Sequence, residues 1–225
     1  MARVPNVAVL LAGCGHMDGA EIREAVFTLL ALDQHGARVQ CLAPDAEQAS
    51  VMDHRTGKPG AGVRNVLEEA SRIARLGQCA DVAKADPAAF DALLLPGGFG
   101  VAKNLCTFAA QGADATVRED VLRFVKAFFE AGKPVGAICI APALAALVLK
   151  AAGRSASLTL GSGQGVEGAM AKLGHRHVAV PSAREIVVDR DLNLVTTPAY
   201  MFDDARLADV WTGIERCVAE VLARA

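Results

Sequence analysis

The chain has 225 residues, of which 52% are hydrophobic and 21% charged, and its mean hydropathy is +0.30. These values are typical of a well-packed globular protein and exclude an intrinsically disordered chain. The formal net charge of −2, with both signs mixed along the sequence, indicates neither a nucleic-acid partner nor an acidic membrane surface. We therefore expect one globular domain spanning residues 1–225.

Two further features bear on location. The longest apolar stretch, Ile138–Leu149, contains Pro142 and is shorter than the roughly 20 residues that a membrane helix needs. The first apolar run, Val7–Ala12, has only the length of a strand, which is not typical of a secretory signal. The six cysteines form no C-x-x-C pair, so we expect neither a disulfide framework nor a metal site, and a reducing cytoplasm.

Apolar strands alternate with amphipathic helices along most of the chain. We expect a helix opened by Thr116 and Glu119 as a capping box, and another capped by Asn65 and Glu68. The expected strands are 7–12, 38–43, 92–95 and 135–138, and the expected helices are 20–34, one after residue 65, 116–131 and 203–223. This alternation predicts a mainly parallel sheet covered by helices on both faces, a three-layer α/β sandwich.

Two segments interrupt that alternation. Residues 45–65 are polar and rich in glycine, which predicts a long surface excursion. Residues 185–198 have the pattern of a small β-hairpin, with strands at 186–188 and 194–196. We expect this hairpin to be an antiparallel appendage to the parallel sheet.

The most informative residue is Cys139, which lies between the expected strand 135–138 and a following helix. Ala137 and Ala141 are small enough for the tight strand-to-helix turn of a nucleophile elbow, and Pro142 suits the first helical position. The start of that helix would favour the thiolate. The alternative is that Cys139 is a small buried hydrophobic residue, as most free cysteines are.

Glycine-rich turns follow two strands. Gly13, Gly15 and Gly19 resemble a dinucleotide-binding loop, but the third glycine is one residue late and no acidic residue ends the next strand, so tight turns explain them better. Residues 96–100, Pro-Gly-Gly-Phe-Gly, can aim free backbone N–H groups at a crevice, as in an oxyanion hole. The same glycines also suit an ordinary turn.

Carboxylates and histidines supply the remaining candidates. Glu21 and Glu24 begin a helix at a strand end, where the helix dipole alone favours acids. Glu24 lies close to the inward stripe, so partial burial would raise its pKa and let it hold a proton for a neighbouring thiolate. No histidine lies within 30 residues of Cys139. The loop residue His16 is near the expected site, His35 and His54 look like surface residues, and His175 and His177 flank the start of a strand.

Five ordered motifs together resemble the ElbB glyoxalase family, a PfpI-type branch of the class I glutamine-amidotransferase-like proteins. The match covers essentially the whole chain. In chain order, the motifs are Val9–Gly15 with Gly19-Ala-Glu21-Ile-x-Glu24-Ala, then Ala43-Pro-Asp45, Pro96–Leu105, Cys139-Ile-Ala-Pro and Val195–Tyr200.

The resemblance implies a flavodoxin-like sandwich, with Cys139 as nucleophile and Glu24 as its carboxyl partner. It also implies an oxyanion site lined by Gly97, Gly98 and Ile140, and a homodimer. Where many relatives carry a histidine one strand after the elbow, this chain has Leu158–Ser162, which counts against a hydrolase that needs a full triad.

These expectations combine into a function. A glyoxalase that needs no metal or organic cofactor would convert small dicarbonyls, such as glyoxal and methylglyoxal, into glycolate and lactate through a Cys139 hemithioacetal. The alternative is a non-catalytic regulatory protein, associated with isoprenoid metabolism, that uses Cys139 as a redox or metabolite sensor. Ammonia transfer from glutamine is a third option, weakened by the missing histidine and the lack of a synthetase domain.

Overall fold

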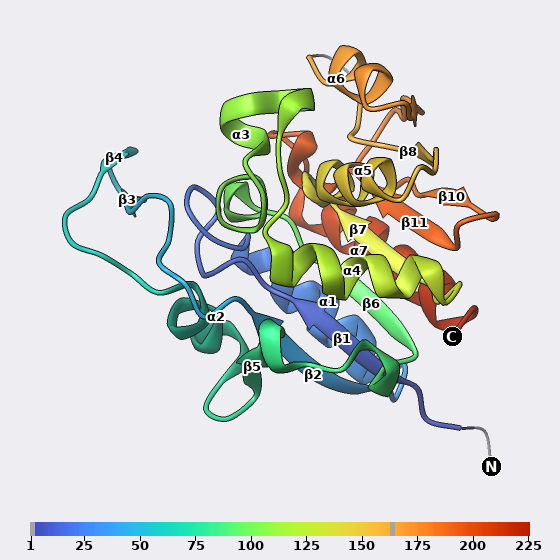
Figure 1. Ribbon diagram of the computed structural model, residues 1–225, viewed down its shortest axis with the longest axis horizontal. Helices are drawn as coiled ribbons and strands as arrows, with labels where there is room; N and C mark the ends of the chain where they lie inside the picture. Colours follow the sequence, from blue (N-terminus) through green and yellow to red (C-terminus); the bar gives the residue numbers. More distant parts are fainter. Residues whose placement is uncertain (1–2, 163–164) are drawn as a thin grey trace.

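A seven-stranded sheet forms the centre of the computed structural model, which describes residues 3–162 and 165–225 (Figure 1). Its strand order is β10-β11-β7-β6-β1-β2-β5, and every neighbouring pair is parallel except β10 with β11. The strands are β1 (Asn6–Leu10), β2 (Arg38–Ala43), β5 (Cys79–Asp81), β6 (Ala92–Leu95), β7 (Val135–Ile138), β10 (Val187–Asp189) and β11 (Leu194–Thr197).

Helices cover both faces of this sheet. Helices α4 (Glu119–Glu130) and α5 (Ala141–Ala151) pack on one face, and α1 (Ile22–Gln34), α2 (Val66–Ala74) and α7 (Leu207–Leu222) pack on the other (Figure 1). Two short helices, α3 (Phe108–Gln111) and α6 (Glu167–Lys172), lie nearer the periphery. Among the helices of the described residues, none is long and apolar enough to cross a membrane.

The alternating direction of strand side chains explains the two cores. Along β1, Ala8 and Leu10 join the core under α4 and α5, while Val7 and Val9 join the core under α1 and α7. All four are fully buried. A strand covered on both faces must be apolar at every position, which accounts for the continuous hydrophobic runs in the sequence. The expected mainly parallel sheet with flanking helices is therefore confirmed.

Several expected boundaries differ from the structure. The strand expected at 7–12 is Asn6–Leu10, and α7 begins at Leu207, four residues later than expected. The hairpin is not an appendage, because β11 pairs with β7 and β10 forms the edge of the main sheet. Pro142 is the second residue of α5 instead of the first. A π-helix, Val101–Leu105, follows the glycine turn, and no sequence signal indicated it.

The capping box at Thr116 is wrong. Helix α4 starts at Glu119 with Arg118 as its N-cap, and no side chain caps it. The backbone N–H of Thr116 instead donates to Thr107 Oγ1 at 2.9 Å, and Cys106 pairs with Val117 in an isolated bridge. This pairing holds Thr116 in extended chain before the helix. By contrast, Asn65 caps α2 as expected, its Oδ1 accepting the backbone N–H groups of Leu67 and Glu68.

Residues 45–65 leave the sheet as expected. Within this excursion, β3 (Met52–Asp53) pairs with β4 (Lys58–Pro59) in a two-stranded ribbon (Figure 1). The backbone N–H of Met52 donates to the buried carboxylate of Asp18 at 2.6 Å, and that of Ala49 donates to Asn104 Oδ1 at 2.9 Å. The excursion is thus fastened to the loop after β1 and to the π-helix. A second small ribbon joins β8 (Ser157–Leu158) to β9 (Arg176–His177).

A close approach at Gly213 fixes how α7 packs. A Cβ at this position would lie 2.1 Å from the carbonyl oxygen of Ala183 and 2.7 Å from Thr197 Oγ1. Thr197 in turn accepts the backbone N–H of Cys139 through its carbonyl oxygen at 2.9 Å. The packing of α7 therefore sets the strand end beside Cys139.

We predict that Gly213→Ala destabilises the protein by about 1–3 kcal/mol, although alanine is the better helix former, because the added methyl group meets backbone that cannot move aside. The matched control is Gly168→Ala in α6, where a Cβ would meet nothing within 4 Å. Urea unfolding should show a loss of stability for the first variant and none for the second. Equal effects would contradict the packing account.

Candidate active site

Cys139 occupies a strained turn between β7 and α5. Its φ is +61°, in the left-handed region that residues other than glycine rarely adopt. Ile140 returns to helical geometry and α5 follows at Ala141. Ala137 and Ala141 are both fully buried, so larger side chains would not fit on either side of the turn. The backbone geometry is that of the expected nucleophile elbow.

Glu24 lies in the first turn of α1 and is fully buried. Its Oε2 accepts the backbone N–H of Gly97 at 3.0 Å, and its Oε1 accepts that of Tyr200 at 3.3 Å. The same carboxyl group forms a hydrogen bond with the Cys139 thiol. Glu24 therefore joins the segments that follow β6, β7 and β11, three adjacent strands whose carboxyl ends meet at this edge.

Two backbone N–H groups, those of Gly98 and Ile140, donate to Cys139 Sγ. The structure corrects the role expected for Gly97, because its N–H is taken up by Glu24 and is not directed at an oxyanion. Gly97 has a different importance: a Cβ there would lie 2.4 Å from Cys139 Cβ and 2.5 Å from Glu24 Oε2. Glycine is required for the carboxyl and the thiol to meet.

Burial controls the protonation of this pair. It raises the pKa of Glu24 from 4.5 to about 8, and the charge of Glu21 adds to the rise, whereas the hydrogen bonds from Tyr200, Cys139 and Gly97 lower it. Burial also raises the pKa of the Cys139 thiol, and the charge of Glu24 raises it further. The helix start favours the thiolate as expected, since the N–H of Ile140 lowers the thiol pKa, but burial and the charge of Glu24 outweigh this effect. Both groups are therefore mainly protonated at pH 7, and Glu24 is the one that loses its proton, near pH 8.

A cavity of about 810 Å³ opens over Cys139, which is itself only 8% exposed. The residues that line it come from the loop after β1, the start of α1, the glycine turn, the elbow, the start of α6 and the segment after β11. They are His16, Glu21, Ile22, Arg23, Gly98, Phe99, Cys139, Ile140, Val166, Tyr200, Met201 and Asp203. Glu21 also caps α1 by accepting the backbone N–H of Glu24 at 2.7 Å.

Sequence reasoning assigned no role to Arg23 and Tyr200. Arg23 Nη1 donates to the Tyr200 hydroxyl at 3.1 Å, and the guanidinium lies 5.8 Å from the centre of the tyrosine ring. Tyr200 also donates its backbone N–H to Glu24 and follows Ala199, whose φ is +43°. Tyr200 is the last residue of the sequence motif at 195–200, and that motif was the signal that could have identified it as a site residue.

None of the five histidines is a hydrogen-bond partner of the Cys139 thiol. His16 lines the cavity, as its loop position indicated. His175 is buried and bonds the carbonyl oxygen of Ala146 at 2.8 Å, while His177 Nε2 accepts the backbone N–H of Leu160 at 3.0 Å. His35 faces Glu215 on the surface, and His54 is exposed, its Nε2 accepting the backbone N–H of Met17. Within residues 3–162 and 165–225, no cluster of three or more potential metal ligands occurs.

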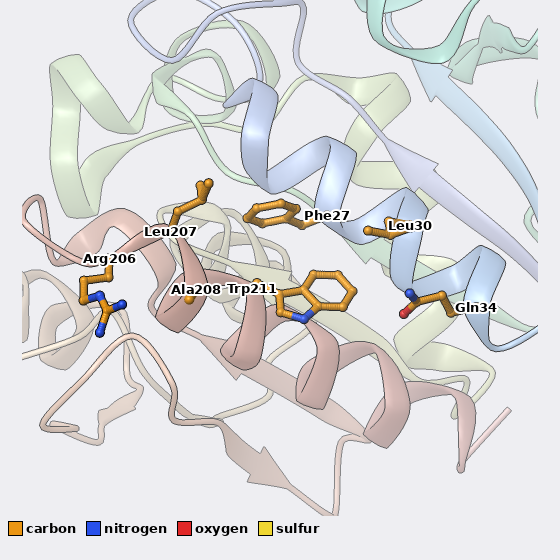
Figure 2. Close-up of a pocket in the computed structure, with 7 residues that line it drawn as sticks. All are labelled: Phe27, Leu30, Gln34, Arg206, Leu207, Ala208 and Trp211. Carbon is orange, nitrogen blue, oxygen red and sulfur yellow. The ribbon is translucent and has the colours of Figure 1, made fainter.

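A second hollow lies between α1 and α7 (Figure 2). Phe27, Leu30 and Gln34 on α1 face Leu207, Ala208 and Trp211 on α7, with Arg206 at one end. Phe27 and Trp211 meet edge to face with their ring centres 5.5 Å apart. This groove holds no nucleophile or carboxylate, so the cavity at Cys139 is the better candidate for chemistry.

The pKa of Glu24 predicts how stability depends on pH. The folded chain keeps the Glu24 proton up to about pH 8, whereas the unfolded chain loses it near 4.5, so stability falls as the pH rises through this interval. Relative to Glu24→Gln, the wild type should lose up to about 4 kcal/mol between pH 4.5 and 8, as measured by urea unfolding. The exposed Glu68→Gln serves as control. Parallel pH profiles for wild type and Glu24→Gln would contradict the assignment.

Comparisons with known proteins place the chain in a family. The family model described as "DJ-1/PfpI family" matches residues 11–204. The human glutamine amidotransferase-like class 1 domain-containing protein 3, mitochondrial, is 45% identical over 96% of this chain and 82% of its own length. The rat mitochondrial ES1 protein homolog is 42% identical over 96% of this chain and 83% of its own length.

Solved structures show the same fold. An isoprenoid biosynthesis protein with an amidotransferase-like domain from Ehrlichia chaffeensis superposes with a TM-score of 0.91 at 36% identity, over 98% of this chain and 99% of that one. Glyoxalase III from Candida albicans superposes with a TM-score of 0.62 at 12% identity, over 98% and 97% of the two chains, a likeness of fold alone. The family model covers most of the sequence, and the chain therefore belongs to the DJ-1/PfpI family.

Proposed function

We propose that the protein is a glyoxalase of the ElbB type that converts 2-oxoaldehydes into 2-hydroxy acids without a metal or organic cofactor. The observation that carries the proposal is the buried Cys139–Glu24 pair at the base of a cavity. A nucleophile and a hydrogen-bonded carboxyl that can take up and release a proton are the two groups that this isomerisation needs. The Ehrlichia relative, at 36% identity, supports the narrower ElbB-type assignment.

In the proposed reaction, Cys139 Sγ forms a bond to the aldehyde carbon, and the thiol proton passes to the carbonyl oxygen by way of Glu24. Glu24, which is ionised in the form of the pair that reacts, then removes the hydrogen of this hemithioacetal carbon as a proton and returns it to the neighbouring carbon, while the hydroxyl proton of the first carbon moves to the oxygen of the second. The first carbon is thereby oxidised to a thioester and the second reduced to an alcohol. Water cleaves the thioester, releasing the hydroxy acid and the free thiol. Glyoxal would give glycolate, and methylglyoxal would give lactate.

The backbone has two roles in this scheme. The N–H groups of Gly98 and Ile140 donate to Sγ, the atom that would bond the substrate carbon, and would stabilise the oxyanion that develops on that carbon. Such donors typically contribute a few kcal/mol each to transition-state stabilisation. Gly97 would act differently from the expected oxyanion donor, since its N–H orients the Glu24 carboxyl.

The sensor alternative has less support from the geometry. Peroxide reacts with thiolates that are accessible and have a low pKa. Cys139 is 8% exposed, and burial raises its pKa. Ammonia transfer from glutamine is disfavoured because, among the described residues, no histidine bonds Cys139. A sensor would be modified stoichiometrically, whereas an enzyme converts many equivalents of glyoxal.

We predict that Cys139→Ala folds but loses at least about 10³-fold of the turnover, and that Glu24→Gln loses about 10²- to 10⁴-fold. Proton NMR with glyoxal measures the product and the rate together. The matched control is Cys79→Ala, because Cys79 lies on the edge strand β5, away from the cavity. Wild-type turnover in Cys139→Ala would overturn the proposal.

We also propose a homodimer formed through α1. Val26 and Leu30 form a short apolar stripe, four residues apart on this helix and 46% and 41% exposed, and Leu30 lines the groove of Figure 2. Such an apolar stripe is typical of a helix that packs against another surface.

The dimer is tested by light scattering coupled to size exclusion. The wild type should elute at twice the monomer mass, and Val26→Lys with Leu30→Lys should elute as a monomer. Leu76→Lys, at a 98% exposed position, should leave the mass unchanged. A wild-type monomer would refute the proposal.

The cytoplasmic location expected from the sequence stays a proposal, because the human and rat relatives are named as mitochondrial proteins.

A further inference from the structure

The cavity is much larger than the substrates considered so far. Its volume of about 810 Å³ equals roughly 27 molecules of liquid water, and falls in the range of pockets that enclose drug-sized ligands. Glyoxal has two carbons and methylglyoxal three. Either compound would leave most of the cavity filled with water.

The walls of the cavity are largely apolar. Ile22, Phe99, Ile140, Val166 and Met201 all line it. Phe99 is 55% exposed and Ile22 47% exposed, so two large apolar side chains at this site face water in the free protein. A substrate with an apolar substituent would cover them and gain the free energy of removing that surface from water.

Both aromatic walls are held in place before any ligand binds. The ring of Phe99 lies 5.8 Å from Lys103 Nζ, and its backbone N–H donates to the carbonyl oxygen of His16 at 2.7 Å. The Tyr200 hydroxyl accepts from Arg23. Fixed aromatic surfaces bind apolar groups with little loss of conformational entropy.

The charged groups in the cavity do not select an anion. Arg23 is accompanied by the carboxylates of Glu21 and Asp203. A negatively charged substituent would meet more negative than positive side chains, so the cavity favours a neutral group.

From these observations we propose that the preferred substrates are 2-oxoaldehydes with a bulky, neutral, apolar substituent on the ketone carbon. This inference rests on the proposed glyoxalase activity. The chemistry is that of the smaller compounds: Sγ attacks the aldehyde carbon, and the substituent occupies the apolar part of the cavity. Phe99 is the side chain that most directly sets this preference, because it is large, exposed and part of the wall.

The test compares 4-methyl-2-oxopentanal with methylglyoxal, using proton NMR to measure kcat/KM for formation of each hydroxy acid. Buried methylene groups discriminate by tenfold or more each in a matching pocket, so kcat/KM should be at least about tenfold higher for the branched aldehyde. Phe99→Ala should reduce this ratio at least about fivefold. The control Leu76→Ala removes a 98% exposed side chain outside the cavity and should keep the wild-type ratio.

Failure of the inference and failure of the proposed function give different results. Cys139-dependent turnover with a ratio of one or less would overturn the substrate preference and leave the glyoxalase in place. If neither aldehyde is turned over, the preference is decided by the affinity of each aldehyde for Cys139→Ala, measured by NMR titration. Tighter binding of 4-methyl-2-oxopentanal supports the apolar cavity, and equal or weaker binding overturns it. Thermal unfolding of Phe99→Ala checks that the fold is intact.

Discussion

The meeting of a buried carboxyl and a buried thiol constrains the rest of this end of the molecule. Glu24 is fully buried and bonds three different segments through Gly97, Tyr200 and Cys139. An ionised carboxylate in such a place is costly unless hydrogen bonds compensate it. The segments that follow β6 and β11 supply that compensation with backbone N–H groups, while the thiol supplies a group that can exchange a proton. The loops that bond Glu24 therefore surround a carboxyl group whose pKa is raised, so that it holds its proton readily.

Backbone shape makes that meeting possible. Cys139 and Ala199 both adopt positive φ, and Gly97 leaves no room for a Cβ between the two reacting groups. Backbone strain of this kind persists when the surrounding packing holds the strained residues in place. Helix α7 contributes to that packing, because Gly213 allows it to approach Thr197 closely. Lys103 and Asn104 on the π-helix add to this support, bonding backbone carbonyl oxygens of Met17, Ala12 and Asp18 in the loop after β1. Stability and site geometry thus depend on the same contacts.

The sequence predicted local features better than long-range ones. Strands 38–43, 92–95 and 135–138 have the expected bounds, because a short, mainly apolar segment bordered by a proline (Pro44, Pro96 or Pro134) is a local signal. Thr116 failed as a cap because its partner, Thr107, is set by the tertiary fold. The proximity of Glu24 and Cys139 was expected from helix position and resemblance, but the bond from Gly97 to Glu24 was not. The raised pKa of Cys139 was also missed, because burial depends on every element around the turn.

The central claim is that Glu24 keeps its proton at neutral pH because it is buried beside Cys139. The most direct measurement is the infrared carbonyl band of the protonated carboxyl group, followed as a function of pH and identified by its absence in Glu24→Gln. We predict that this band persists through pH 6 and 7 and disappears with a midpoint near 8. Loss of the band by pH 6 would mean that Glu24 is an ordinary carboxylate, and would contradict the account of the pair.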